Sequence, residues 1–490
     1  MGLPAAPGDN EMITPSQAKA RVPRALLWTS LLRVVVRSLG VVTILVLARL
    51  IPPEQYGIFA TILIANQILG AAVSVRLDLV QTPKDPRPYL NTAWTTELTR
   101  GVVLFVLTQA LAQPWCDLFR VPEAAPLLRV LAFVHVIFAF HNTGTDLLRR
   151  ELRFGRIFIL HATEAITYSV VTIAVAFALH SAWALVAGTL VSFAARVVAS
   201  YALTPIRGHV GFEWSKFTEM FRFSRWTNAY ILLDFIVETA DNAVVARVAN
   251  PTALAFYRMG YQIATEGSTA LQFVVTSVAY PAVARLQFDR EHVRQSFRGI
   301  LGLASSSLFP ITALLVVLGP VLVPLALGDR WAPAAAPLQV LALAAFARGL
   351  LETARPVLLG IGRSWEDFLL KVVQAVTLLA IVIPAGIVAG VDGVARGVLA
   401  AALLSLPAWV YFLRTRVGIT ARDFVEPALA PVIATAVAAS IIMLLPAAEV
   451  SWPSLLGHGA AFALAYVVSS GALLGVLPRS GIAVARHSLR

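Results

Sequence analysis

The chain has 490 residues, of which 58% are hydrophobic and only 13% are charged, and its mean hydropathy is +0.76. A soluble globular protein carries about 25% charged residues, so this composition excludes a soluble protein and indicates one that crosses the membrane many times. Cys116 is the only cysteine, which excludes an intrachain disulfide and a cysteine-ligated metal cluster.

Apolar stretches of spanning length follow one another along the chain. Because about 20 helical residues cross a hydrocarbon core of about 30 Å, we predict an all-α integral membrane protein with about fourteen transmembrane helices. They are expected near residues 27–48, 57–78, 92–113, 126–146, 158–179, 183–203, 226–246, 254–281, 299–320, 336–358, 367–388, 392–412, 428–446 and 454–477. Short turns at His180 and Val391 should fold the spans beside them into antiparallel hairpins. Residues 1–26 lack the apolar core of a signal peptide, so we expect a disordered cytoplasmic tail there.

Basic residues alternate between the two sides of the predicted helices. Lys and Arg accumulate in the loops on the side of both termini, for example within 149–156 and 285–298. The loops of the opposite side hold only Arg49, Arg120, Arg247 and Arg330. Because basic loops mark the cytoplasmic side, we expect both termini in the cytoplasm. The net charge of +12 therefore reflects membrane topology, and it does not indicate a nucleic-acid partner.

The chain contains an internal repeat. Residues 28–59 match residues 226–257 without gaps at an offset of 198, which aligns Pro53 with Pro251. The repeat predicts two pseudo-symmetric six-helix lobes plus two C-terminal helices, and in transporters such repeats place the substrate path at their interface. The predicted parts are an N-lobe at 27–203, an interfacial cytoplasmic segment at 204–225, a C-lobe at 226–412, and the last two helices with a cytoplasmic C-terminus at 413–490.

The predicted helix at 226–246 carries three carboxylates. Asp234, Glu238 and Asp241 are spaced by four and three residues, so they lie on one helical face. An ionised side chain near the bilayer centre costs about 2.5 to 3.5 kcal/mol, so such residues face a bundle interior or a wet cavity. We therefore expect a charged group to bind or pass along this face.

Basic side chains interrupt the apolar helices as well. Arg33 and Arg37 lie on one face of the first helix, and the offset of 198 puts Arg37 at the membrane depth of Asp234. Further polar stripes consist of Arg258, Gln262 and Glu266, and of Arg348, Glu352 and Arg355.

These charges have two interpretations. They either line a cavity for a charged substrate or pair with one another as structural links between helices. Basic residues nearer the helix ends, among them Arg196 and Lys371, are expected to extend toward the lipid headgroups.

The sequence carries no enzyme signature. Phosphate-binding loops, nucleophile elbows and paired-histidine zinc motifs are absent. The predicted loops are also too short for a folded domain outside the membrane, so function should reside in the helical bundle.

Several segments resemble one family of transporters. The segments are LARLIPPEQYGIFA at 47–60, DNAVVARV at 241–248 with AFY at 255–257, and YPAVARLQFD at 280–289. They resemble the polysaccharide exporters, or Wzx-like lipid-linked oligosaccharide flippases, of the multidrug/oligosaccharidyl-lipid/polysaccharide exporter superfamily, with the colanic-acid exporter type most similar. The resemblance spans essentially the whole chain and implies twelve helices in two lobes plus two C-terminal ones.

The resemblance implies a function and roles for the charged residues. It implies that undecaprenyl-diphosphate-linked glycan moves from the inner to the outer leaflet of the bacterial inner membrane by ion-driven alternating access, without a cofactor. The diphosphate would bind to arginines, whose forked donors suit phosphate oxygens; the candidates are Arg33, Arg37, Arg258, Arg348 and Arg355. The carboxylates would bind the coupling ion, Na⁺ or H⁺, or hold those arginines in the empty state; the candidates are Asp234, Glu238, Asp241 and Glu266.

The expected partners are lipid-linked oligosaccharide, membrane lipids, and a polysaccharide polymerase with its export machinery, but no nucleic acid. Two other functions stay open. A multidrug or other small-molecule exporter would share the fold, although it would favour an acidic, aromatic cavity for cations. A membrane glycan polymerase or ligase would use similar lipid-linked substrates, but such enzymes generally have a sizeable loop or domain outside the membrane.

Overall fold

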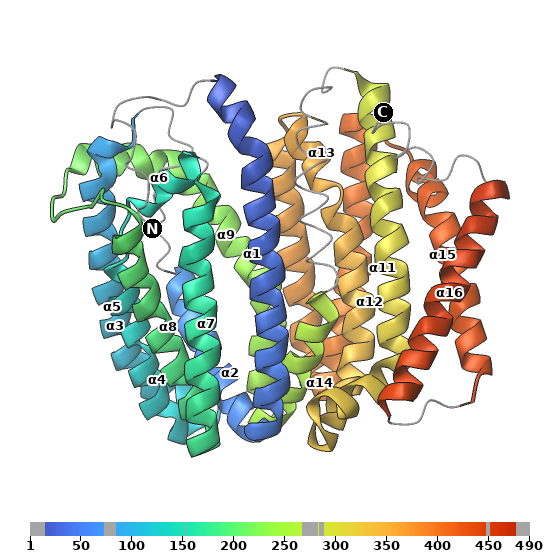
Figure 1. The fold of residues 1–490 in the computed structure, drawn as a ribbon, viewed down its shortest axis with the longest axis horizontal. Helices are drawn as coiled ribbons and strands as arrows, with labels where there is room; N and C mark the ends of the chain where they lie inside the picture. The colour runs from blue at the N-terminus through green and yellow to red at the C-terminus, as the bar shows by residue number, and fades with distance from the viewer. Residues whose placement is uncertain are drawn as a thin grey trace, which may run out of the picture. The chain divides into compact units, whose positions relative to one another are not determined.

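A computed structural model of the chain describes residues 15–72, 85–151, 153–266, 283, 289–446 and 451–476. All secondary structure in these described ranges is helical, which confirms the predicted all-α class. The chain divides into two compact units, shown with their helices in Figure 1. Unit 1 consists of Met1–Pro52 and Ala65–Ala229, and unit 2 consists of Pro53–Ile64 and Tyr230–Arg490.

Unit 1 holds most of the helices of the first half of the chain. They are α1 (Pro15–Leu50), the later part of α2 (Pro53–Ala72), η1 (Arg87–Tyr89), α3 (Leu90–Leu118), η2 (Pro122–Ala124), α4 (Ala125–Leu131), α5 (Phe133–Ala139), α6 (Thr145–Arg150), α7 (Phe154–Leu179), α8 (Ala182–Leu203) and the start of α9 (Trp214–Val248). Within this unit α7 packs along α8 and α1 packs against α7.

Unit 2 contains the start of α2, the rest of α9 and all later helices. They are a helix at 251–266, α11 (Arg290–Leu327), η3 (Asp329–Ala334), α12 (Ala335–Glu352), α13 (Arg355–Gly360), α14 (Ser364–Val417), α15 (Ala421–Leu444) and α16 (Trp452–Val476). Helix α11 packs against α12 and α15, and α15 packs against α16.

Ten helical stretches of the described residues are long and apolar enough to cross a membrane. One of them, α14, contains two predicted spans, because its backbone leaves the helix at Ala389 and at Gly390, where φ is +58°. A residue without a side chain adopts this left-handed conformation readily. Helices α1 and α9, with 36 and 35 residues, are not among the ten, but both exceed the length of a span. The predicted span at 254–281 is described only as far as residue 266.

Several predicted boundaries differ from the structure. Helix α1 begins at Pro15, inside the expected tail, and α9 begins at Trp214, inside the segment expected along the membrane surface. The hydrophobic run fixes where a helix crosses lipid, whereas its ends extend into water wherever helix-forming polar residues follow. The expected tail residues 1–14 lie outside the described ranges.

Two predicted continuous spans are broken into shorter helices. The span at 126–146 becomes α4, α5 and α6, and the span at 336–358 becomes α12 and α13. Before α6, the Asn142 side chain accepts a hydrogen bond from the Gly144 N–H and donates one to the Ile206 carbonyl. These bonds compensate for helix hydrogen bonds that the break leaves unmade.

The internal repeat reappears in the helix boundaries. Helix α1 ends at Leu50 and α2 begins at Pro53; α9 ends at Val248 and the next helix begins at residue 251, at the same offset of 198. Within unit 2, the start of α2 lies directly against the start of the 251–266 helix. The contact is so close that a Cβ atom added to Gly57 would lie 1.7 Å from the Pro251 carbonyl oxygen. Only glycine permits this approach.

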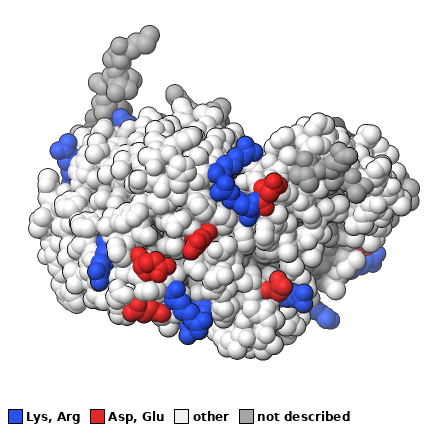
Figure 2. Space-filling view, turned by 90° about the horizontal axis from the view of Figure 1, so that it is seen from below, with Lys and Arg blue, Asp and Glu red and all other residues white. Residues whose placement is uncertain are grey.

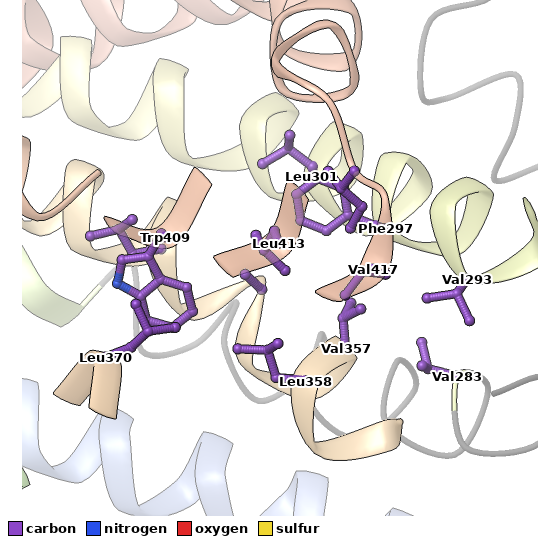
Figure 3. Packing of buried hydrophobic residues seen from close by; sticks show 13 residues of the cluster. Val283, Val293, Phe297, Leu301, Val357, Leu358, Leu370, Trp409, Leu413 and Val417 are labelled. Carbon is purple, nitrogen blue, oxygen red and sulfur yellow. The ribbon is translucent and has the colours of Figure 1, made fainter. Parts of the chain in front are cut away.

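A hydrophobic cluster packs three helices of unit 2 together (Figure 3). Phe297 and Leu301 of α11 meet Leu358 of α13 and Trp409 and Leu413 of α14 there. These side chains are at most 3% exposed, and burial of each such side chain contributes about 1.5 to 3 kcal/mol. The cluster therefore holds α13 against α11 and α14.

Candidate functional site

A polar cavity of about 280 Å³ lies among the helices of unit 2. It is lined from α9, the 251–266 helix, α12, α13 and α14 by Asp234, Glu238, Tyr261, Thr265, Ala345, Arg348, Glu352, Arg355, Lys371 and Gln374. On the face shown in Figure 2, charged side chains form a few small groups on a mostly uncharged surface. The concentration of charge in an apolar bundle makes this cavity the candidate site.

Lys371 of α14 links two other helices across the cavity. Its Nζ lies 3.0 Å from Asp234 Oδ1 of α9 and 3.2 Å from Glu352 Oε1 of α12. The Lys371 side chain is 5% exposed, whereas that of Asp234 is 48% exposed. The prediction that Lys371 extends to the headgroups is therefore wrong, because two carboxylates compensate for its burial inside the bundle.

A second chain of contacts joins α9 to α12 through a tyrosine. The Tyr261 hydroxyl donates to Glu238 Oε2 at 2.8 Å and accepts from Arg348 Nη1 at 3.2 Å. Arg348 is 9% exposed, and its Nη2 has no hydrogen-bond partner. Tyr261 therefore links the Arg348 guanidinium to the Glu238 carboxylate.

Arg355 is held from two sides. Its Nε lies 3.3 Å from Asp367 Oδ2, and its guanidinium carbon lies 4.4 Å from the centre of the Tyr230 ring. Such contact with an aromatic face adds a favourable cation–π interaction. The Arg355 side chain is still 34% exposed, so it remains accessible from the cavity.

Asp241 lies near the cavity without lining it. It is fully buried and accepts hydrogen bonds from the Tyr257 hydroxyl at 2.8 Å and from the Asn242 side-chain amide at 3.0 Å. The three carboxylates predicted to share one helical face therefore differ in their surroundings. Asp234 and Glu238 line the cavity, whereas Asp241 is buried among uncharged hydrogen-bond donors.

The other predicted residues have different places. Arg258 and Glu266 belong to the 251–266 helix but do not line the cavity. Arg37 belongs to α1 of unit 1, whereas Asp234 belongs to unit 2, where it bonds to Lys371. The Arg33 side chain lies outside the described part of the structure. Of the predicted candidates, Asp234, Glu238, Arg348 and Arg355 come together at the cavity.

Sequence reasoning missed Lys371 and Gln374. The signal was present, because Asp367, Lys371 and Gln374 repeat the four-and-three spacing of the acidic face of α9. All three are at most 5% exposed. Among the described residues no group of three His, Cys, Asp or Glu could hold a metal ion.

Unit 1 has its own charged contact. Arg196 Nη1 of α8 lies 2.8 Å from Glu164 Oε2 of α7, and its guanidinium carbon lies 5.3 Å from the centre of the Phe138 ring. His161 Nδ1 is 3.7 Å from the same carboxylate oxygen. The prediction that Arg196 extends to the headgroups is therefore wrong, and this pair links the α7–α8 hairpin.

A second ionic cluster of unit 2 joins α11 to α15; it consists of Arg294, Arg298, Asp423 and Glu426. Asp423 is fully buried and accepts from Arg294 Nε at 2.8 Å. Its other oxygen accepts from the Thr420 N–H and hydroxyl, each at 2.8 Å, as part of the capping box of α15. Glu426 pairs with Arg298 and Arg422. We call this group the α11–α15 cluster.

Comparison with known proteins decides the family. The family model described as "Polysaccharide biosynthesis protein" matches residues 46–336, more than half of the chain. The chain belongs to this family. The predicted resemblance to polysaccharide exporters is thereby confirmed.

Relatives of the chain in this family bear names that concern surface polysaccharides. The chain is 24% identical over 376 residues to the lipopolysaccharide biosynthesis protein WzxC of Escherichia coli (strain K12), with 76% of each chain covered. It is also 24% identical over 374 residues to the succinoglycan biosynthesis transport protein ExoT of Rhizobium meliloti (strain 1021), with 74% of each covered.

Solved structures of transporters share the fold. The inward closed conformation of the lipid II flippase MurJ matches with a TM-score of 0.72 and 15% identity, covering 93% of this chain and all of that one. An inward-facing multidrug resistance transporter of the MATE family matches with a TM-score of 0.64 and 15% identity, covering 78% of this chain and 94% of that one. The fold of this family member is therefore that of a multi-span membrane transporter.

Proposed function

We propose that this family member moves undecaprenyl-diphosphate-linked oligosaccharide from the inner to the outer leaflet of the bacterial inner membrane, for surface polysaccharide synthesis. The observation that carries the proposal is the cavity of unit 2, where six charged side chains from α9, α12, α13 and α14 meet inside an apolar bundle. Relatives named for polysaccharide synthesis and transport, and the fold shared with a lipid II flippase, support the same substrate class.

The arginines are proposed to hold the phosphate oxygens, because a guanidinium can donate two parallel hydrogen bonds to an anion. Arg33, Arg37 and Arg258 remain candidates on the basis of the sequence. The predicted phosphate role of Arg348 and Arg355 is not proposed, because in the cavity a carboxylate and tyrosines already contact their guanidinium groups.

The carboxylates are proposed to couple transport to an ion gradient. Asp234 and Glu352 share the Lys371 ammonium. A Na⁺ or H⁺ that binds either carboxylate therefore competes with Lys371. A ligand that displaces Lys371 would strengthen ion binding, and by linkage the ion would affect the ligand to the same extent. Such reciprocity is the requirement for ion-driven alternating access.

The proposed orientation places both termini in the cytoplasm, with a glycan polymerase as a partner on the opposite side. Alkaline-phosphatase fusions test the orientation, because the reporter is active only outside the cytoplasm. A fusion near Arg330 should be active and one near Arg294 inactive. The reverse result would contradict the proposed topology.

A multidrug exporter is the second candidate, favoured by the MATE fold likeness alone. We propose that it is not the function here, because the three carboxylates of the cavity are balanced by three cations and attract no cationic drug. An enzymatic role is likewise not proposed, because the relatives are transport or biosynthesis proteins and the sequence has no catalytic motif.

The direct test removes the gene and locates the lipid-linked oligosaccharide. Loss of the protein should reduce surface polysaccharide and make the lipid-linked units accumulate on the inner leaflet, where membrane-impermeant reagents do not reach them in intact spheroplasts. Accumulation of units that such reagents already modify at the outer surface would instead favour a polymerase or ligase.

A further inference from the structure

The cavity of unit 2 has no net charge among its lining residues. Arg348, Arg355 and Lys371 are matched by three carboxylates, Asp234, Glu238 and Glu352. A site for a diphosphate needs an excess of positive charge, because its oxygens would otherwise approach carboxylates at close range. The balance of charge therefore favours a neutral polar ligand.

The contacts of the three cations favour the same class of ligand. Lys371 lies within 3.2 Å of two carboxylates, Arg355 contacts Asp367, and Arg348 is tied to Glu238 through Tyr261. An anion at these cations would compete with the carboxylates and tyrosine that already contact them, and it would bring its own charge close to those carboxylates. A neutral ligand can add hydrogen bonds while the pairs persist.

Two buried polar atoms of the lining residues have no hydrogen-bond partner in the part of the chain that the structure describes. They are Nη2 of Arg348 and Oε1 of Gln374, on side chains that are 9% and 5% exposed. One is a donor and the other an acceptor, and a buried group of either kind is destabilising when it is left unpaired. A hydroxyl group can accept from the first and donate to the second. A ligand rich in hydroxyl groups can therefore supply the hydrogen bonds that Arg348 and Gln374 lack.

The size of the cavity limits the ligand. Its volume of about 280 Å³ lies just below the range of about 300 to 1,000 Å³ that is typical of pockets for drug-sized molecules. A single pyranose ring is smaller than such a molecule and fits, whereas a complete oligosaccharide does not.

We infer that the unit 2 cavity binds one sugar residue of the lipid-linked glycan, through hydroxyl contacts to Arg348, Gln374 and the cavity carboxylates, and does not bind its diphosphate. This inference rests on the proposed function, and it assigns glycan recognition to a place separate from phosphate recognition. The cavity then makes transport depend on the presence of a sugar on the carrier.

The test compares lipids that differ only in their glycan. The full-length protein, purified in lipid nanodiscs, is titrated with undecaprenyl diphosphate, with the same carrier bearing glucose, galactose or N-acetylglucosamine, and with the complete lipid-linked oligosaccharide of the host. At least one glycosylated lipid should bind about tenfold more tightly than the bare carrier, as one or two charge-assisted hydrogen bonds predict.

Gln374→Met removes the amide and keeps the length of the side chain. It should bring the affinity for the glycosylated lipid close to that for the bare carrier, while Gln295→Met on the exposed face of α11 should preserve the tenfold preference. The thermal midpoint of each purified variant, and the variant Gln374→Asn, which keeps an uncharged amide, separate loss of binding from loss of folding.

Two outcomes overturn the inference while the proposed function stands. Equal affinity of the wild type for bare and glycosylated carriers would show that the cavity does not recognise sugar. Equal weakening of all the lipids by Gln374→Met would place the diphosphate in the cavity. Failure of the wild type to bind any of these carriers would contradict the proposed function itself.

Discussion

Unit 2 contains two buried ionic groups of similar composition but different construction. In the α11–α15 cluster, both oxygens of the buried Asp423 carboxylate have donors at 2.8 Å. In the cavity, two carboxylates share one lysine and the third accepts from a tyrosine, and two lining side chains keep an unpaired polar atom. The first arrangement is complete without a ligand, whereas the second is not.

The difference in pairing indicates a structural role for the α11–α15 cluster and a binding role for the cavity. A fully paired carboxylate stabilises one arrangement of helices, because any movement breaks several bonds at once. A group with unpaired atoms and adjacent space has more than one arrangement of similar free energy, which a ligand can select. The comparison therefore predicts loss of transport from changes in the cavity and loss of stability from changes in the α11–α15 cluster.

The largest effect is expected for Lys371→Met. It leaves Glu352 and Asp234 without their cation, and removing one member of a buried ion pair costs about 3 to 5 kcal/mol. Lipid-linked oligosaccharide transport, measured in reconstituted vesicles, should fall below detection.

The double variant, Lys371→Met with Glu352→Gln, should have a thermal midpoint close to that of the wild type. It should still not transport lipid-linked oligosaccharide. Normal transport by this double variant, at normal protein levels, would show that the Lys371 contacts are only structural.

Asp423→Ala should have the next largest effect, on stability. The contact between buried Asp423 and the partly exposed Arg294 is lost together with the capping box of α15, and the cost is about 3 kcal/mol. The thermal midpoint should fall, while transport per folded molecule stays near the wild-type value. A variant with a normal midpoint but no transport would place the α11–α15 cluster in the transport mechanism.

Tyr261→Phe should reduce transport by about tenfold, with a small change in stability. The variant removes one hydroxyl, which donates to Glu238 and accepts from Arg348, and hydrogen bonds to charged groups contribute about 1.5 to 3 kcal/mol. Tyr411→Phe is a matched control, because Tyr411 is 64% exposed on α14. Equal losses in both variants would argue against a role for the Arg348 to Glu238 link.

Arg422→Ala should have the smallest effect. Its side chain is 74% exposed and pairs with Glu426 at the edge of the α11–α15 cluster, where water screens the pair. Neither the thermal midpoint nor the transport rate should change measurably. A loss as large as that of Asp423→Ala would mean that burial does not determine which contacts of the cluster stabilise the protein.

Hydrophobic runs predicted the spans well where the helix is continuous. The expected spans 158–179 and 183–203 correspond to α7 at Phe154–Leu179 and α8 at Ala182–Leu203. The break before Thr145 was missed, since its unmade helix bonds are compensated by contacts with residues far along the chain, such as Asn142 with Ile206. Local sequence does not contain that information.

The candidate site shows the same limit. Spacing identified the charged faces that carry Asp234, Glu238, Arg348 and Arg355, because side chains four or three residues apart share a helical face. It gave the wrong surroundings for Lys371, which has a chain long enough to reach either the headgroups or the bundle interior. Its direction is decided by carboxylates on two other helices.

The division of α2 between the units has a consequence for biosynthesis. Residues Pro53–Ile64 belong to unit 2, where Gly57 fits against Pro251 and Tyr56 meets Trp331 edge to face at 5.6 Å. A ribosome completes these partners only after nearly 200 and 280 further residues, respectively. During synthesis, the start of α2 therefore lacks its packing partners until the second half of the chain has been made. A fragment that ends at Ala229 never acquires these partners, so membrane proteases should degrade it.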